Sequence, residues 1–277
     1  MKKALLFLSG LFFFTASFAQ KEKVKKTHEV GIFIGCSFYI GDLNPTGYFG
    51  PLTQPAGGVL YRLNYNRRFS FKAGFNYGTI EGDDSKSNSP SQQARNLSFK
   101  SYIHELAVEA EFNFLDYRTG NTKYPYSPYI FAGIAVFQFD PETQLGNQWI
   151  ELEPLGTEGQ GTVGGAKKYK LTQISIPFGF GMKFSMSKRI CLGLEWGMRK
   201  TFTPYLDDVS GTYASPAVLA QNGPTAVVLG NRSIGTEPSA MTGSQRGDGG
   251  KDDWYSFAGV TLTFTLHAKE KPCYSYK

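Results

Sequence analysis

The feature that most constrains the fold is an alternation of large apolar side chains with small or polar ones. It is clearest in residues 190–200, "ICLGLEWGMRK". The apolar positions are Leu192, Leu194, Trp196 and Met198, and those between them are Gly193, Glu195, Gly197 and Arg199. A period of two places successive side chains on opposite faces of a β-strand. The segment therefore predicts a strand with one apolar face and one face of glycine and charge.

The same alternation recurs along most of the chain and predicts eight strands. The other seven are expected in 28–41, in the two arms of a hairpin over 59–80 that turns near Asn66 to Phe69, and in 100–114, 127–140, 173–185 and 252–267. In 127–140 both faces are apolar, so its facing stays open. Each segment can supply the roughly 9–11 residues that a tilted strand needs to cross a bilayer.

Two observations distinguish a membrane barrel from a soluble sandwich, which would also alternate. First, the face opposite the apolar one is small or polar, as the narrow interior of a small barrel requires. Second, short links (67–69, 116–126, 186–189) alternate with long ones (42–57, 81–98, 141–170, 201–251). We therefore expect an all-β fold: a monomeric, eight-stranded, antiparallel, transmembrane up-and-down β-barrel with long extracellular loops and short periplasmic turns.

The N-terminus indicates export. Residues 1–19 combine two lysines, an apolar core over 4–14 and Ser17-Phe18-Ala19, as in a secretory signal peptide. We expect a basic periplasmic arm over 20–27, the barrel over 28–267 and a periplasmic tail over 268–277. The protein is then expected in the outer membrane with both termini in the periplasm, in contact with outer-membrane lipid.

Composition agrees with a strand-rich protein. Aromatic residues make up 15% of the chain and 32 residues are glycine, which favours strands and tight turns. The net charge of +6 is not accompanied by a nucleic-acid-binding motif, so no nucleic-acid partner is expected.

The polar faces predict a network of ion pairs in the lumen. The expected members are Arg62, Lys72, Glu105, Glu109, Glu111, Lys183, Glu195 and Arg199. An eight-stranded barrel has room inside only for side chains, so these balanced charges should pair and plug it. A proton or ion relay through the same residues is the alternative.

The sequence predicts neither an active site nor a resident metal or other cofactor. Of the three histidines, His28 and His267 fall at strand ends, and His104 is expected to face lipid with Leu106 where a serine nucleophile would be needed. Acidic residues gather in one predicted loop: Asp207, Asp208, Asp248, Asp252 and Asp253. Calcium binding and turn capping both suit them, but their spacing matches no calcium-loop motif.

Three cysteines leave at least one thiol unpaired. Cys36 is expected on the lipid face and Cys191 in the lumen, so these two should not pair. Cys273 falls in the tail.

Four stretches resemble the PorG-like outer-membrane barrels of Bacteroidota, a family in which PorG is a component of the type IX secretion system. They are "HEVGIFIGCSFYIGDLNP" (28–45), "FNYGTIEGDD" (75–84), "GLEWGMRKTFTPYLDDVSGTY" (193–213) and "RGDGGKDDWYSFAGVTLTF" (246–264). The resemblance implies a non-enzymatic assembly or anchoring component with periplasmic ring proteins as partners.

Two surfaces are candidates for such contacts. The expected periplasmic partner surface comprises Tyr124, Tyr126, Cys273, Tyr274 and Tyr276, because tyrosine is favoured at interfaces. The alternative is a surface adhesion or ligand-binding barrel that works through the long loops 141–170 and 214–251.

Overall fold

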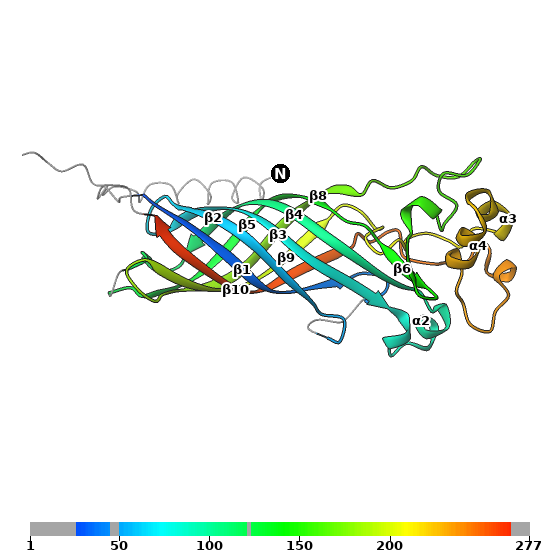
Figure 1. Cartoon of the computed structure of the whole chain (residues 1–277), viewed down its shortest axis with the longest axis horizontal. Helices are drawn as coiled ribbons and strands as arrows, with labels where there is room; N and C mark the ends of the chain where they lie inside the picture. Colours follow the sequence, from blue (N-terminus) through cyan, green and yellow to red (C-terminus); the bar gives the residue numbers. More distant parts are fainter. Residues whose placement is uncertain (1–25, 45–49, 121–122, 267–277) are drawn as a thin grey trace, which may run out of the picture.

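Eight long strands close into one antiparallel barrel (Figure 1). The computed structural model describes residues 26–44, 50–120 and 123–266. The barrel strands are β1 (Thr27–Ile40), β2 (Gln54–Asn64), β3 (Phe69–Asp83), β4 (Ser98–Asn113), β5 (Tyr126–Gln138), β8 (Thr172–Ser185), β9 (Ile190–Thr201) and β10 (Trp254–Leu266). Each pairs with the next barrel strand in sequence, and β1 pairs with β10 to complete the ring. The predicted up-and-down eight-stranded barrel is confirmed.

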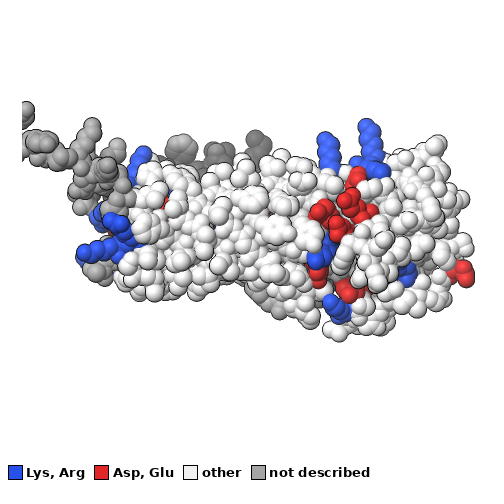
Figure 2. All heavy atoms as spheres, in the orientation of Figure 1, with Lys and Arg blue, Asp and Glu red and all other residues white. Residues whose placement is uncertain are grey.

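The alternation of side chains sets which face of the wall is outside. On β4, Leu106 and Val108 are 63% and 55% exposed, whereas the intervening Glu105 and Glu109 are 0% and 2% exposed. The outward apolar residues of all eight strands form a band without charged side chains on the face shown in Figure 2. An apolar exterior around a polar interior is the arrangement of a membrane-spanning barrel.

The connections differ in length at the two ends of the barrel. Residues 65–68, 114–125 and 186–189 link strands at the end where β1 begins and β10 finishes, which we call the turn end. Residues 41–53, 84–97, 139–171 and 202–253 link strands at the opposite, loop end. The predicted rhythm of short and long links is therefore present. β2 begins at Gln54 and not near residue 59. The sequence pattern placed its start too late, because Gly57 and Gly58 interrupt the apolar alternation by which a strand is recognised.

The three longest loop-end connections, 84–97, 139–171 and 202–253, fold together into a cap (Figure 1). The cap contains η2 (Asp84–Lys86), α2 (Pro90–Arg95), β6 (Glu142–Leu145), β7 (Gln148–Glu151), η3 (Glu153–Leu155), α3 (Pro216–Leu219), η4 (Ala220–Asn222), α4 (Pro224–Gly230) and η5 (Pro238–Met241). None of the helices in the described residues is both long and apolar enough to cross a membrane.

One apolar core runs from the barrel mouth into the cap. Ile80, Ile103 and Phe137 line the mouth, and they belong to the same buried cluster as Leu206 and Leu229 of the cap. All five side chains are at most 1% exposed. The long connections are thus packed structure, and their burial fixes the cap on the barrel.

Large aromatic side chains inside the barrel were not expected. On β5, whose facing the sequence left open, Tyr129, Phe131 and Phe137 point into the lumen and Ile134 points outward. Glycines on β8 and β9 make room for them: a Cβ added to Gly197 would lie 2.6 Å from Cζ of Phe131. The lumen therefore combines aromatic rings with charge, and the expectation of a small or polar interior was incomplete.

Candidate functional site

The centre of the lumen is organised around Lys72 on β3. Its Nζ lies 2.7 Å from Oε2 of Glu109 and 2.6 Å from Oε1 of Glu195. The hydroxyl of Tyr129 donates to Glu195 over 2.7 Å, and the Phe131 ring centroid lies 4.7 Å from the ammonium. Lys72 and these two glutamates are each at most 8% exposed, so their charges are compensated by one another rather than by water.

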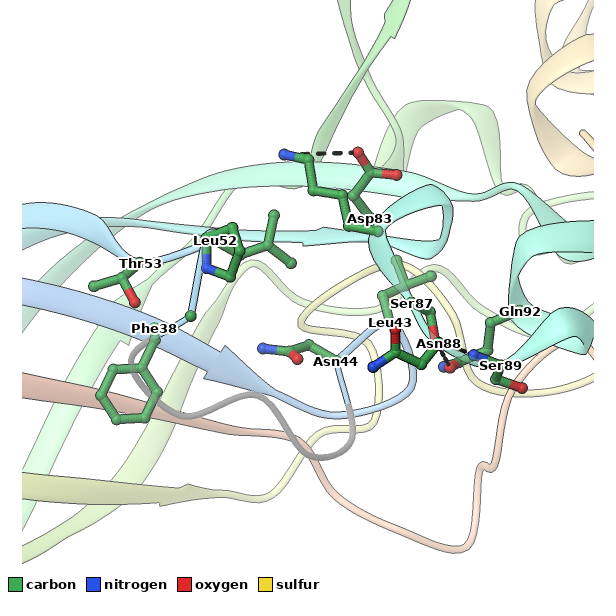
Figure 3. A pocket seen from close by; sticks show the side chains of 13 residues that line it. Phe38, Leu43, Asn44, Leu52, Thr53, Asp83, Ser87, Asn88, Ser89 and Gln92 are labelled. Carbon is green, nitrogen blue, oxygen red and sulfur yellow. Dashed lines mark hydrogen bonds and ion pairs between the residues drawn. The ribbon is translucent and has the colours of Figure 1, made fainter.

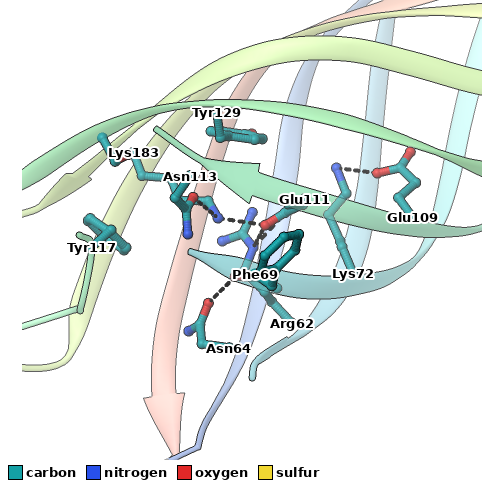
Figure 4. Close-up of polar contacts among 12 residues, drawn as sticks. Arg62, Asn64, Phe69, Lys72, Glu109, Glu111, Asn113, Tyr117, Tyr129 and Lys183 are labelled. Carbon is teal, nitrogen blue, oxygen red and sulfur yellow. Dashed lines mark hydrogen bonds and ion pairs between the residues drawn. The ribbon is translucent and has the colours of Figure 1, made fainter. Parts of the chain in front are cut away.

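A second group lies nearer the turn end (Figure 4). Arg62 on β2 bonds Glu29 on β1 over 3.2 Å and Glu111 on β4 over 3.0 Å. Glu111 also accepts from Lys183 over 2.5 Å, and Lys183 reaches the amide oxygen of Asn113 over 3.0 Å. Four strands are thus tied together across the lumen by one connected set of charge-assisted hydrogen bonds.

A third group lies nearer the loop end. Nε of Arg199 on β9 lies 3.1 Å from Oε2 of Glu105 on β4, which also accepts from the Tyr255 hydroxyl over 2.7 Å. Nη2 of Arg199 lies 4.0 Å from Oε1 of Glu109, which links this group to the central one.

All eight residues predicted for the lumen network are in the lumen, and each has an ionic partner there. Sequence reasoning missed Glu29, which is 0% exposed. Its place on the same face as Gly31 and Gly35 was the available signal, but Glu29 lies near the end of the strand, where the alternation has few neighbours. With Glu29 the network has five carboxylates and four cations, so the balance is not the four against four expected from sequence.

The lumen is filled along its length. Between the central residues remains a cavity of about 20 Å³, room for about one water molecule. At the turn end, residues 114–120 reach into the opening: Tyr117 is 4% exposed and Thr119 donates to Glu29 over 2.7 Å. The other two turns need only four residues each, so the extra length of 114–125 serves to close the barrel.

At the loop end, two buried carboxyl groups share one tyrosine. The Tyr39 hydroxyl lies 2.5 Å from Oδ2 of Asp207 and 3.1 Å from Oδ1 of Asp253. The other oxygen of Asp207 accepts from the Val209 amide, and that of Asp253 from the Leu206 amide, both over 2.9 Å. These bonds hold the start of connection 202–253 against the mouth of the barrel.

The carboxyl pair cannot easily carry two charges. Burial raises the pKa of Asp207 to about 8, with a further contribution from Asp42. Burial and then the charge of Asp207 raise the pKa of Asp253 well above its usual value. A negative charge on one of these buried acids opposes ionisation of the other, so the pair favours keeping at least one carboxyl group protonated. Arg95 is the cation that opposes this effect at Asp207.

The five acidic residues considered for calcium do not converge. Asp208 is buried, with Arg246 at 3.6 Å and the Tyr169 hydroxyl at 2.8 Å, apart from the pair formed by Asp207 and Asp253. Asp248 contacts Lys251 and Asp252 contacts Lys200, over 2.8 Å and 3.6 Å. Within the described residues, no three histidine, cysteine or acidic side chains are placed to hold a metal ion.

The described histidines lie on the outer wall among aromatic rings. Nδ1 of His28 is 2.6 Å from the Tyr61 hydroxyl, and the His104 ring centroid is 5.1 Å from that of Tyr77. His267 lies outside the described residues.

Only part of the expected partner surface can be placed. Tyr124 is half-buried at the turn end, and Tyr126 is 49% exposed on the outer wall opposite Phe184 of β8. Residues 1–25, Cys273, Tyr274 and Tyr276 lie outside the described residues. Cys36 is half-buried and Cys191 buried in the lumen, both as free thiols.

Comparison with protein families places the chain. The profile of the family described as "Domain of unknown function (DUF6089)" matches residues 5–220. The chain belongs to this family. A search of curated proteins found none that matches it.

Several solved barrels are similar in fold to this DUF6089 chain. The N-terminal β-barrel domain of Pseudomonas aeruginosa OprF has 9% identity and a TM-score of 0.37, over 87% of this chain and 100% of that one. Neisserial surface protein A has 9% identity and a TM-score of 0.40, over 87% and 97%. The outer membrane protein OprG from Pseudomonas aeruginosa has 10% identity and a TM-score of 0.39, over 88% and 99%.

The lumen network yields a prediction about stability. Lys72→Met preserves volume but leaves Glu109 and Glu195 buried without their main cation, and should lower the free energy of unfolding by about 3–5 kcal/mol. Glu109→Gln is the matched control. It removes one of the five carboxylates, while Lys72 keeps Glu195 and Arg199 keeps Glu105 as partners. It should change the free energy of unfolding by about 1 kcal/mol or less. Urea unfolding of the refolded barrel in lipid, followed by tryptophan fluorescence, measures both. A greater loss in Glu109→Gln would contradict this account of the network.

The carboxyl pair yields a prediction about pH. Asp207 in the unfolded chain ionises near pH 4, whereas in the folded protein its pKa is about 8. Its stabilising contribution is therefore complete below about pH 4 and lost as pH rises through 8. Hydrogen exchange of segment 202–253 should quicken, after correction for intrinsic exchange, as pH rises from about 4 to about 8, and should change little above about pH 8. Asp207→Asn should reduce this dependence, and an equal dependence in both proteins would exclude the pair as its cause.

Proposed function

We propose that the protein is a non-enzymatic barrel of the outer membrane that acts as an assembly or anchoring component and not as a channel. The observation that carries this proposal is the filled lumen. Ion pairs occupy its length, residues 114–120 cover the turn end, and the core under the cap fills the loop end. A solute has no path through such a barrel, so its role must rest on the surfaces that it presents.

The arrangement of polar groups favours a non-catalytic role. A hydrolytic site needs a nucleophile or activated water beside a base, with space for a substrate. In the described residues, the two histidines contact aromatic groups on the wall. The buried carboxyl pair is enclosed: Tyr39 is 0% exposed, Asp207 1% and Asp253 2%.

The type IX secretion system is the assembly that we propose. Support comes from the resemblance of the four quoted stretches to PorG-like barrels. The turn end would then meet periplasmic ring proteins, with Lys123 and Tyr124 in the contact. Tyr126 belongs to the outer wall and suits the lipid interface as well as a protein contact.

A pocket at the rim favours the alternative role in surface ligand binding. It has a volume of about 630 Å³ and is lined by Phe38 of β1, by residues of the connection 41–53, by Asp83 at the end of β3 and by residues of the connection 84–97 (Figure 3). Leu43 and Leu52 form apolar parts of its lining, and Asn44, Asn88 and Gln92 supply amide groups. Such a lining suits a small polar ligand with one apolar face.

The filled lumen predicts the absence of a pore. Full-length protein reconstituted in planar bilayers should give no steady conductance of porin size, because the ion pairs and aromatic rings leave room for about one water at the centre. A porin reconstituted in the same way serves as the positive control. A stable ion current from the folded barrel would refute the closed-lumen part of the proposal.

Site-specific photo-crosslinking in intact cells tests which surface works. A photoreactive amino acid at Lys123 reports on the turn end, and one at Val163, which is 92% exposed on the cap, reports on the loop end. Ile134, which is 69% exposed at mid-wall, is the lipid-facing control. Anchoring predicts adducts with a periplasmic protein at Lys123. Adducts at Val163 alone would contradict anchoring through the turn end and would favour ligand binding at the loop end.

A further inference from the structure

The turn end is strongly basic. Its described residues include seven exposed or half-buried basic side chains: Lys26, Arg67, Arg68, Arg118, Lys123, Lys188 and Arg189. Among the described residues of the turn end, Asp116 is the one acidic side chain that is not buried. It lies 3.8 Å from Arg67 and 2.6 Å from Arg68. Every turn contributes, so the cations form a rim around the barrel and not a single cluster.

Several of these cations lie over aromatic rings at the base of the barrel. Nζ of Lys26 is 4.4 Å from the centroid of Tyr65, and the guanidinium carbon of Arg189 is 6.0 Å from that of Phe264. Tyr65 and Phe264 are 49% and 44% exposed on the outer surface. The charges are therefore placed at the turn-end edge of the lipid-facing wall, beside aromatic rings of the kind found at the bilayer interface.

Apolar side chains adjoin the same rim. Met186, which lies in the same turn as Lys188 and Arg189, is 63% exposed, and Leu115, in the same connection as Arg118, is 40% exposed. Figure 2 shows basic atoms at this end of the uncharged band and acidic atoms, with some basic ones, at the other. Such a rim suits a phospholipid leaflet, because its apolar groups can contact acyl chains, its aromatic rings the interface and its cations the lipid phosphates.

We infer that the turn-end rim binds the phosphates of anionic phospholipids and so places this end of the barrel in the phospholipid leaflet. An acidic protein would also attract these cations. Lipid fits the geometry better, because Lys26 and Arg189 lie over outward-facing rings of the wall and not across the mouth of the barrel. The binding is independent of the anchoring role proposed above.

Native mass spectrometry of the full-length protein tests the inference. Detergent-purified barrel is titrated with phosphatidylglycerol or with phosphatidylcholine of the same acyl chains, and retained lipids are counted. The wild type should retain phosphatidylglycerol preferentially. The variant Arg118→Gln, Lys188→Gln, Arg189→Gln should bind it at least about tenfold more weakly, because each cation near an anionic lipid surface contributes separately to binding.

A variant with the same change of charge at the other end is the matched control. Lys167→Gln, Lys168→Gln, Lys170→Gln removes three exposed lysines of the cap and should leave retention of phosphatidylglycerol unchanged. The heat-induced shift of the barrel on gels checks that both variants fold. Equal retention of the two lipids by the wild type, or equal losses in the two variants, would overturn the inference. Capture of an acidic periplasmic protein through the rim, with lipid retention unchanged in the turn-end variant, would replace lipid by that protein.

Discussion

Closure of the sheet is the constraint on which the rest of the structure depends. In hydrocarbon, each backbone amide and carbonyl needs a partner inside the protein, so a spanning sheet has to have no free edge. Pairing of β1 with β10, from His28 opposite Leu266 to Ile40 opposite Trp254, supplies the last row of bonds. Closing only eight strands makes the interior narrow, and this determines what the inward residues have to do.

A narrow lumen converts every inward charge into a buried charge. Removing Lys72 or Arg62 from water is unfavourable unless carboxylates replace the lost hydration, and each of these two cations has two such partners. Arg62–Glu29 and Lys72–Glu109 join neighbouring strands, whereas Arg62–Glu111 and Lys72–Glu195 join strands that are not neighbours in the sheet. The pairs therefore fix both the register of the wall and the contacts across the lumen. Aromatic rings and glycines divide the remaining space, so that the interior is packed and not aqueous.

The sequence predicted the wall well and the cap poorly, for a physical reason. Lipid outside and a narrow lumen inside impose a period of two, which appears in the sequence as alternating apolar and polar residues. Charged residues on the polar face could therefore be assigned to the lumen. Glu29 escaped because it stands at a strand end, where alternation has few neighbours. The bonds of Tyr39 with Asp207 and Asp253 join residues 168 and 214 positions apart, a pairing that no local pattern encodes.

That long-range contact also determines how the cap is presented. Tyr39 belongs to β1, whereas Asp207 and Asp253 lie near the two ends of the connection between β9 and β10. One hydroxyl therefore fastens both ends of the longest loop to the wall, and Arg246 secures its later part through Glu158 and Asp208. A loop held at both ends by buried polar bonds has little freedom to adapt to a ligand. Any molecule that recognises the loop end must therefore fit a surface that is already formed.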